Sequence, residues 1–192
     1  MSPDDRRAAI VKAVIPLLTR HGSAVTTRQM AGAARVAEGT IFKVFPDKYA
    51  LIHEAVRVAM DPSHVQQQMA AIDPDLAFEE KLRAAAGILL RRLEDVIAWM
   101  AVLRTMPPVD GRPPTGLPPF IAGANAAIVA SLTTLFESHR AMLRLPPARA
   151  AVIFMGLLFA AGHLAGTVGE RLTVDEIVSV LQSGIVNGGE KP

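Results

Sequence analysis

The sequence predicts an all-α protein with a small three-helix unit at its N-terminus and a larger helical bundle behind it. Apolar residues recur at helical spacing in most segments, and no segment alternates apolar and polar residues as a strand does. With 192 residues, of which 51% are hydrophobic and 20% charged, the chain can bury a sizeable core and is not intrinsically disordered. We expect roughly nine or ten helices.

The first helix carries Ile10, Val14 and Leu18 on one face, and Gly22 marks its end. A second helix is expected to start near Thr27 and to be short, because apolar residues soon resume with a different phase.

Capping residues place the next helix boundaries. Thr26 and Gln29 form a capping box, in which each side chain satisfies an amide of the other residue. Pro46 breaks the third helix, and Asp47 is placed to cap a fourth helix over residues 48 to about 60.

The remaining two thirds of the chain also read as helix. The stretch from Asp75 to Thr105 is rich in good helix formers, with a possible break around Glu94. A proline-rich loop follows at residues 106–119. Further helices are expected over 120–143, 147–169 and 173–186, the last with Thr173 and Glu176 as its capping pair.

The run from Ala150 to Gly169 contains no formally charged residue and is long enough to cross a bilayer. His163, Thr167 and four glycines dilute its apolar character, and no aromatic belt accompanies it. We therefore expect this helix to be buried in protein, in the core or against another subunit, and expect no membrane contact.

Positive charge is concentrated in the first third of the chain. Residues 1–60 hold nine Lys and Arg against five Asp and Glu, whereas the rest of the chain is slightly acidic. This asymmetry is typical of a polyanion-binding module joined to a neutral body. It divides the chain into a domain over 1–60 and a domain over 61–192.

The segment from Thr26 to Phe45 has the apolar spacing of a helix-turn-helix motif. Ala31 is small enough for two helices to cross closely, and Val36, Ile41 and Val44 are expected to face the core. The same spacing turns four residues of the second helix outward, as on a helix that enters the major groove. These residues are Glu38, Gly39, Thr40 and Lys43.

Residues Thr26 to Leu51 resemble the DNA-binding signature of the TetR family of bacterial transcriptional regulators. Phe42 and Phe45 match a pair of aromatic residues in that pattern, and Pro46, Asp47, Lys48 and Leu51 match the start of its fourth helix. The resemblance is in sequence over residues 6–60 and in architecture beyond them. It implies a helix-turn-helix DNA-binding domain followed by a helical domain for ligand binding and dimerisation.

Four residues depart from the family pattern. Arg35 stands where glycine is usual in the turn, and Ala37 replaces a serine or threonine that would cap the next helix. Phe42 lacks the hydroxyl of the usual tyrosine, and Val44 lacks the imidazole of the usual histidine. We expect a strained or reshaped turn and weaker anchoring to the DNA backbone than in other members.

The resemblance assigns DNA-binding roles to eight residues. Those at the start of the second and fourth helices are expected to contact phosphates, and those of the recognition helix are expected to reach base edges or phosphates. The expected DNA-binding residues are Thr27, Arg28, Glu38, Gly39, Thr40, Phe42, Lys43 and Lys48.

The resemblance also implies a homodimer that is released from a palindromic operator by a small molecule. The helix at 147–169, with a neighbouring helix, is the expected dimer interface. We expect a pocket among the middle helices, with the loop 106–119 as its lid, and an apolar effector, because few charges accompany the candidate residues. These are Trp99, Met100, Leu103, Met106, Phe120 and Phe136.

An enzyme is the main rival class. The chain has no cysteine, no phosphate-binding loop, no Gly-x-Ser-x-Gly motif, and no histidine pair at metal-ligand spacing. We expect no catalytic residue, metal site or cofactor. The charged N-terminus lacks a signal-peptide core, which favours the cytoplasm. The alternative function is a helical protein-interaction adaptor that does not bind DNA.

Overall fold

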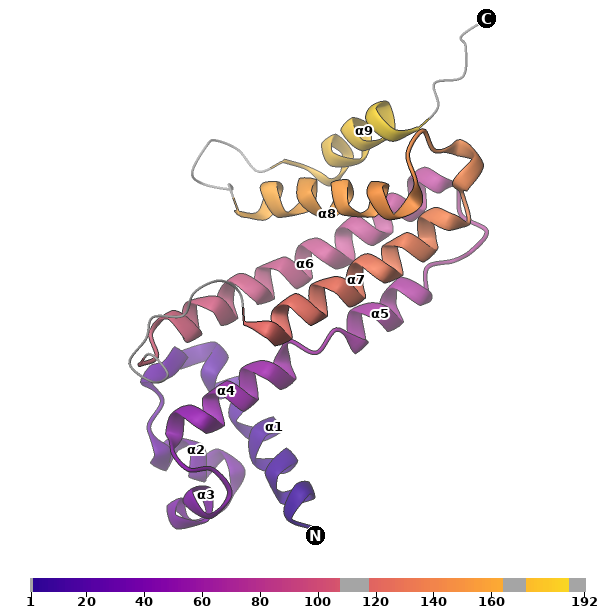
Figure 1. Cartoon of the computed structure of the whole chain (residues 1–192). Helices are drawn as coiled ribbons and strands as arrows, with labels where there is room; N and C mark the ends of the chain where they lie inside the picture. Colours follow the sequence, from indigo (N-terminus) through magenta and orange to yellow (C-terminus); the bar gives the residue numbers. More distant parts are fainter. Residues whose placement is uncertain (1, 108–117, 164–171, 187–192) are drawn as a thin grey trace, which may run out of the picture. The chain divides into compact units, whose positions relative to one another are not determined.

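The computed structural model describes residues 2–107, 118–163 and 172–186, which form nine α-helices and two short 3₁₀ helices (Figure 1). Within these ranges no β-strand is present, and the one extended pairing is an isolated bridge between Leu143 and Val186. The prediction of an all-α fold is confirmed.

The described residues divide into two compact units. The first combines Met1–Asp61 with Val96–Phe120, and the second combines Pro62–Asp95 with Ile121–Pro192. The long helix α6 (Phe78–Arg104) contributes residues to both units.

The first unit is built from α1 (Pro3–His21), α2 (Thr27–Ala34), α3 (Glu38–Val44) and α4 (Lys48–Ala59). Helix α1 packs against each of the other three helices and so forms the centre of the unit. The fully buried side chains of this core include Ile10, Val14, Leu18, Val25, Met30, Ile41, Phe45, Leu51 and Ile52.

The predicted helix boundaries of this unit are confirmed. The Thr26 side chain accepts a hydrogen bond from the Gln29 amide, and the Gln29 side chain accepts one from the Thr26 amide. The Asp47 carboxylate caps α4 by accepting from the Ala50 amide at 2.8 Å. Gly22 ends α1 with φ of 59°, in the half of conformational space that favours glycine.

The second unit contains α5 (Ser63–Ala70), most of α6, α7 (Pro119–Glu137), α8 (Pro147–His163) and α9 (Val174–Ile185). The short helix α5 is not among the predicted helices, because its sequence has only two apolar positions that become buried, Val65 and Met69. The break expected near Glu94 is wrong, since α6 is continuous there. The predicted cap of α9 by Thr173 and Glu176 is confirmed.

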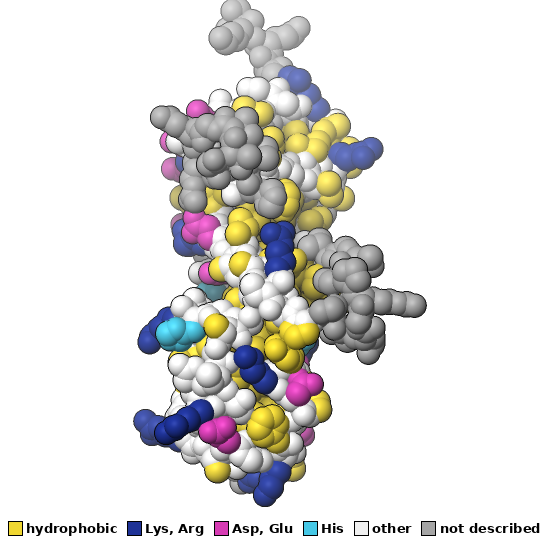
Figure 2. Space-filling model, turned by 90° about the vertical axis from the view of Figure 1, so that its left-hand side faces the viewer, with side chains coloured by type: hydrophobic (Ala, Val, Ile, Leu, Met, Phe, Trp, Pro, Cys, Tyr) yellow, Lys and Arg dark blue, Asp and Glu magenta, His cyan; other side chains and the backbone are white. Residues whose placement is uncertain are grey.

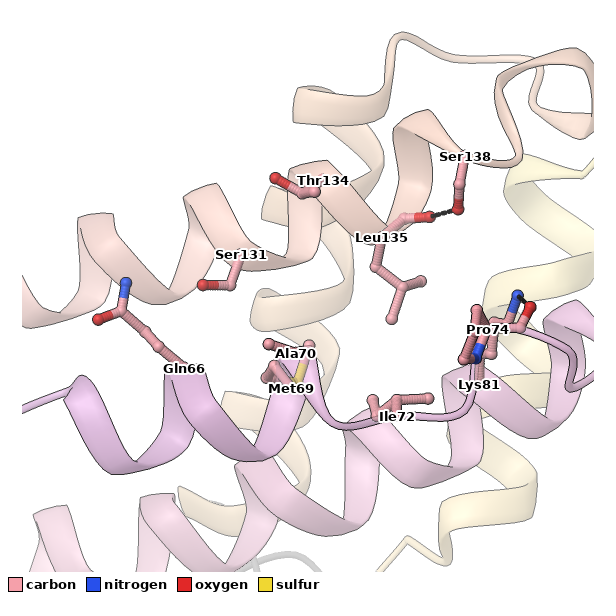
Figure 3. A pocket seen from close by; sticks show the side chains of 10 residues that line it. All are labelled: Gln66, Met69, Ala70, Ile72, Pro74, Lys81, Ser131, Thr134, Leu135 and Ser138. Atoms are coloured by element: carbon pink, nitrogen blue, oxygen red, sulfur yellow. Dashed lines mark hydrogen bonds between the residues drawn. The ribbon is translucent and has the colours of Figure 1, made fainter.

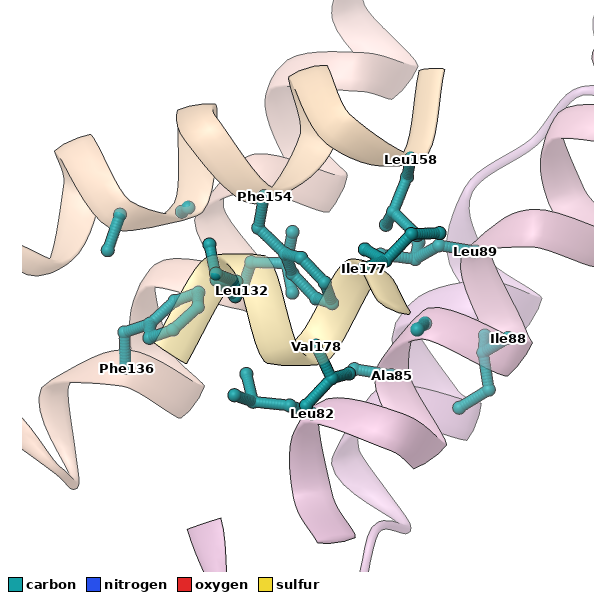
Figure 4. Close-up of a cluster of buried hydrophobic side chains, with 14 of the residues drawn as sticks. Leu82, Ala85, Ile88, Leu89, Leu132, Phe136, Phe154, Leu158, Ile177 and Val178 are labelled. Atoms are coloured by element: carbon teal, nitrogen blue, oxygen red, sulfur yellow. The ribbon is translucent and has the colours of Figure 1, made fainter. Parts of the chain in front are cut away.

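The core of the second unit lies between α6, α7, α8 and α9, which contribute the side chains drawn in Figure 4. Phe136 is fully buried at its centre. The Phe136 ring meets those of Phe78 and Phe154 edge to face, with centroid distances of 5.8 and 6.1 Å. Such pairs contribute beyond the apolar area they bury.

Helix α7 is long and apolar enough, by length and composition alone, to cross a membrane. In the structure it buries a helical stripe that includes Ile121, Ile128 and Phe136. Helix α8 likewise buries Phe154 and Leu158. Both helices therefore pack as core helices of a folded unit do.

Two predicted segments extend outside the described residues. The helix expected over 147–169 is described as far as residue 163, and its remainder lies outside. Residues 108–117 of the proline-rich segment also lie outside, so its role as a lid stays a prediction.

Candidate nucleic-acid interface

Helices α2 and α3 form the predicted helix-turn-helix, joined by residues 35–37. Ala31 is 3% exposed, which fits its expected place at a close helix crossing, and Ile41 is fully buried beneath α3. Val36 and Val44 are half-buried beside them. The apolar side of the motif thus faces the core of the first unit, and its other side is free to meet a partner.

Arg35 adopts a left-handed conformation in the turn, with φ of 54° and ψ of 43°. Its amide donates to the Gly32 carbonyl at 3.2 Å, and the Val36 amide donates to the Ala31 carbonyl at 3.0 Å. This pair of bonds is a Schellman motif, which usually has glycine at the left-handed position. The predicted strain at Arg35 is therefore present in the backbone.

Arg35→Gly is expected to raise the free energy of unfolding by about 1 kcal/mol, because glycine adopts this conformation without a Cβ clash. Denaturant unfolding of the DNA-free protein measures the change. Arg28→Gly is the matched control, since exposed Arg28 lies in right-handed helix and its replacement should destabilise by about 0.5–1 kcal/mol. Equal effects of the two substitutions would contradict a strained turn.

The eight expected DNA-binding residues all lie in the first unit, and none is fully buried. Arg28, Glu38, Gly39, Phe42 and Lys43 are exposed, and Phe42 retains 51% of its accessible surface. The half-buried members are Thr27, Thr40 and Lys48. Their DNA contacts stay predictions.

The ends of α3 and α4 differ in how they are capped. Ala37 precedes α3 without any side-chain hydrogen bond to its first turn, as the missing hydroxyl predicts. At the start of α4 the Asp47 carboxylate occupies one amide, and the Lys48 ammonium lies 5.5 Å from the Tyr49 ring centre. Helix α3 therefore keeps more uncapped amides at its start than α4 does.

Arg7 holds the end of α3 against α1 and α4, a role that sequence reasoning missed. Its guanidinium donates to the Val44 carbonyl at 3.2 Å and lies 4.3 Å from the centre of the Phe45 ring. It also pairs with Glu54 at 3.9 Å, and Glu54 accepts two hydrogen bonds from Arg57 at 2.8 and 2.9 Å. Helix periodicity alone gives no signal for such a contact.

Hydrogen bonds from Arg57 lower the pKa of Glu54, against the opposing effect of burial, and the charge of Arg7 adds to the lowering. A carboxyl with a lowered folded-state pKa stabilises the protein above its unfolded pKa, and this contribution is lost as the pH falls through the folded value. The ion-pair network therefore supports the first unit at neutral pH and weakens in acid.

Glu54→Gln is expected to lower the free energy of unfolding by about 1 kcal/mol at pH 7. At an acidic pH below the lowered pKa of Glu54, where the carboxyl is neutral in the folded protein as well, the difference from the unmodified protein should vanish. Urea unfolding at both pH values measures it. Glu38→Gln is the control, because exposed Glu38 has no ion pair within the described residues. An equal loss of unfolding free energy in Glu54→Gln at both pH values would contradict a stabilising role of the Glu54 charge.

Basic side chains of the first unit do not merge into one patch on the face drawn in Figure 2. Lys and Arg lie there in small groups among uncharged side chains, with acidic side chains beside some of them (lower part of Figure 2). Binding of a polyanion at this face would thus rest on individual contacts.

The six expected ligand-binding residues are divided between the two units. Five belong to the first unit: Trp99, Met100, Leu103, Met106 and Phe120. Trp99 is 7% exposed, and the other four are half-buried. Phe136 belongs to the core of the second unit and is fully buried against other aromatic rings. A pocket shared by all six stays a prediction.

The second unit has a pocket of about 400 Å³ between α5 and α7 (Figure 3). None of the six expected residues lines it. Its wall is formed by Gln66, Met69, Ala70, Ile72, Pro74, Lys81, Ser131, Thr134, Leu135 and Ser138. Because α5 has too weak an apolar pattern to be predicted, this pocket could not be expected from the sequence. Among the described residues, no group of three His, Cys, Asp or Glu is placed to hold a metal ion.

No protein-family model matches the chain, and no curated protein matches its sequence significantly. Solved structures do match. A Mesorhizobium loti protein described as a TetR-family transcriptional regulator superposes with a TM-score of 0.69 at 18% identity, covering 97% of this chain and 99% of that one.

Two further matches name small molecules. A Saccharomonospora viridis protein described as a transcriptional regulator in complex with choline gives a TM-score of 0.66 at 18% identity, over 96% of this chain and all of that one. The flavonoid-responsive regulator FrrA gives 0.61 at 19% identity, over 97% of this chain and all of that one. The chain therefore has the fold of TetR-family regulators across nearly its full length.

Proposed function

We propose that this chain, which has the fold of TetR-family transcriptional regulators, is a dimeric repressor that binds a palindromic DNA operator and is released by a small molecule. The observation that carries the proposal is the orientation of α3. Its fully buried Ile41 anchors one side, while Glu38, Gly39, Phe42 and Lys43 are exposed on the other. A recognition helix needs this arrangement to enter the major groove.

The exposed residues suit distinct contacts with a duplex. Glu38 can accept a hydrogen bond from a cytosine amino group, and Lys43 can reach a base edge or a phosphate. Thr27 and Arg28 at the start of α2, and Lys48 at the start of α4, suit phosphates. Residues 1–60 would then act as the reading domain and residues 61–192 as the sensing and dimerising domain.

A dimer is proposed through α8 and α9, which pack against each other within the second unit. Val152 and Phe159 on α8 are 56% and 54% exposed, and Val180 on α9 is 60% exposed. Gly156 has open space at its Cβ position, so another helix could approach α8 closely there. Two copies would present two recognition helices to a palindrome.

The effector is proposed to be a small molecule of largely apolar character, sensed in the cytoplasm. Proteins of the same fold include one described in complex with choline and one named as flavonoid-responsive. Helix α6 contributes residues to both units. A change caused by ligand binding in one unit could therefore be passed to the other along one continuous helix.

Selection of bound duplexes from a random DNA pool tests the proposal. A palindromic consensus with half-sites about one helical turn apart, near 34–36 Å, would support a dimeric reader. Recovery of no enriched sequence at low salt would overturn DNA binding and favour the adaptor alternative.

Lys43→Glu is expected to weaken binding to the selected duplex at least about tenfold, because it places a repelled charge where a base or phosphate contact is proposed. Fluorescence anisotropy at fixed salt measures the affinity. Lys12→Glu is the matched control, since Lys12 is exposed on α1 and the change in net charge is identical. An equal loss in both variants would assign the effect to overall charge rather than to α3.

A further inference from the structure

The pocket of the second unit has the size of a small-molecule site. Its volume is about 400 Å³, and ligand pockets are typically about 300–1,000 Å³. Residues of α5 and of the segment after it form one side, and residues of α7 form the other (Figure 3). The Leu135 side chain points from α7 into the space between the two sides (Figure 3).

Lys81 is the one charged side chain in this wall. Although it belongs to the first turns of α6, it is only 8% exposed. Its ammonium donates to the Pro74 carbonyl at 2.6 Å, and no described carboxylate forms an ion pair with it. An ammonium has three protons to donate, so a buried lysine held by one carbonyl retains capacity for an anionic partner.

Two carboxylates near Lys81 in the sequence are engaged elsewhere. Glu80 accepts from the Ala77 amide at 3.0 Å, and Asp73 accepts from the Asp75 amide at 2.9 Å. These side chains therefore serve the turn before α6 and its first residues. The positive charge of Lys81 is left for a group that enters the pocket.

The opposite end of the pocket is polar but uncharged. Gln66 and Ser131 lie away from Lys81, with Met69 and Leu135 between (Figure 3). The Ser131 hydroxyl donates to the Ala127 carbonyl at 3.2 Å, which leaves its oxygen free to accept. The wall is thus cationic at one end and apolar in the middle, with hydrogen-bonding groups at the far end.

We propose that this pocket binds a small monocarboxylic acid with an apolar chain or ring. The carboxylate pairs with the Lys81 ammonium, and the hydrocarbon part packs against Met69, Ile72 and Leu135. A hydroxyl group at the far end of the ligand can reach Ser131 or Gln66. The role of this acid as effector rests on the proposed function, whereas its binding to the pocket does not.

Isothermal titration of the full chain with two probe acids, octanoate and 3-phenylpropionate, tests the proposal without DNA. At least one acid is expected to bind saturably, one per chain, and its neutral amide, octanamide or 3-phenylpropanamide, at least about tenfold more weakly. Failure of both acids to bind, or equal binding of acid and amide, would overturn the proposal.

Lys81→Met keeps an unbranched apolar side chain of similar length to the lysine stem and removes the charge. It is expected to weaken binding of the acid at least about tenfold and to leave binding of the amide unchanged. Lys12→Met, at an exposed position of α1, is the control and should change neither. Unchanged acid binding in Lys81→Met would overturn the assignment of the carboxylate to Lys81.

Ala70→Trp provides a second variant should Lys81→Met fail to fold. Ala70 lines the pocket but is exposed, so a larger side chain can enter the space without displacing the core. The variant is expected to keep its circular dichroism spectrum and to lose binding of the acid. Retained acid binding would show that the acid occupies another site.

Comparison with DNA binding separates the two proposals. An acid that binds through Lys81 to a protein that selects no duplex supports this pocket and contradicts the proposed function. Selection of a palindrome by a protein that binds neither acid supports the proposed function and contradicts this pocket. Release of the selected duplex by the acid from the unmodified protein, but not from Lys81→Met, would support both.

Discussion

Phe45→Ala is expected to lower the free energy of unfolding by about 3–5 kcal/mol, whereas Phe42→Ala should change it by less than about 1 kcal/mol. Phe45 is 1% exposed and lies under the Arg7 guanidinium, so its removal leaves a cavity in the first unit and a cation without its ring. Phe42, three residues earlier, is 51% exposed.

Equilibrium unfolding in urea, followed by circular dichroism, measures both changes in the absence of DNA. Affinity for the selected duplex supplies a second readout. Phe42→Ala should weaken DNA binding at unchanged stability, because Phe42 lies on the exposed side of α3. Similar destabilisation by the two substitutions would show that α3 is not oriented as described.

This pair shows what the sequence could predict. Helical spacing identified Ile41 as the buried anchor of α3, whereas Phe45 follows the helix in an extended conformation and is buried outside that spacing. The capping pairs at Thr26 and Asp47 also fixed helix starts correctly, because caps depend on residues close in the chain. Local chemistry therefore predicted most of the helix-turn-helix.

The features that the sequence did not predict depend on distant residues. The hydrogen bond from Arg7 to the Val44 carbonyl joins positions far apart in the chain, and the burial of Lys81 requires α5 and α7 to pack beside it. A lysine near the start of a helix is usually solvated, so no local pattern marks this one as buried. Such contacts arise from tertiary packing.

The second prediction with a large expected effect concerns the proposed dimer. In an isologous interface each substitution occurs twice, once in each subunit. Val152 lies one turn before Gly156 on α8, on a helix face that also includes Phe159, and exposed apolar groups of this size mark interaction surfaces when they cluster. A carboxylate introduced at Val152 would face apolar groups of the partner subunit in the proposed interface.

Val152→Glu is therefore expected to convert the proposed dimer into a folded monomer and to weaken binding to the selected palindrome roughly 100-fold, since the two recognition helices then bind independently. Sedimentation velocity at micromolar concentration measures the first effect, and anisotropy the second. Met142→Glu is the control, because Met142 is 45% exposed in the same unit but lies outside α8 and α9. A subunit in which Val152 is 56% exposed can accept the charge without unfolding, so loss of DNA binding with unchanged circular dichroism assigns the effect to assembly. If the Val152→Glu variant remained a dimer, the dimer interface would lie elsewhere. If the unmodified chain sedimented as a monomer, the proposed dimer would be ruled out.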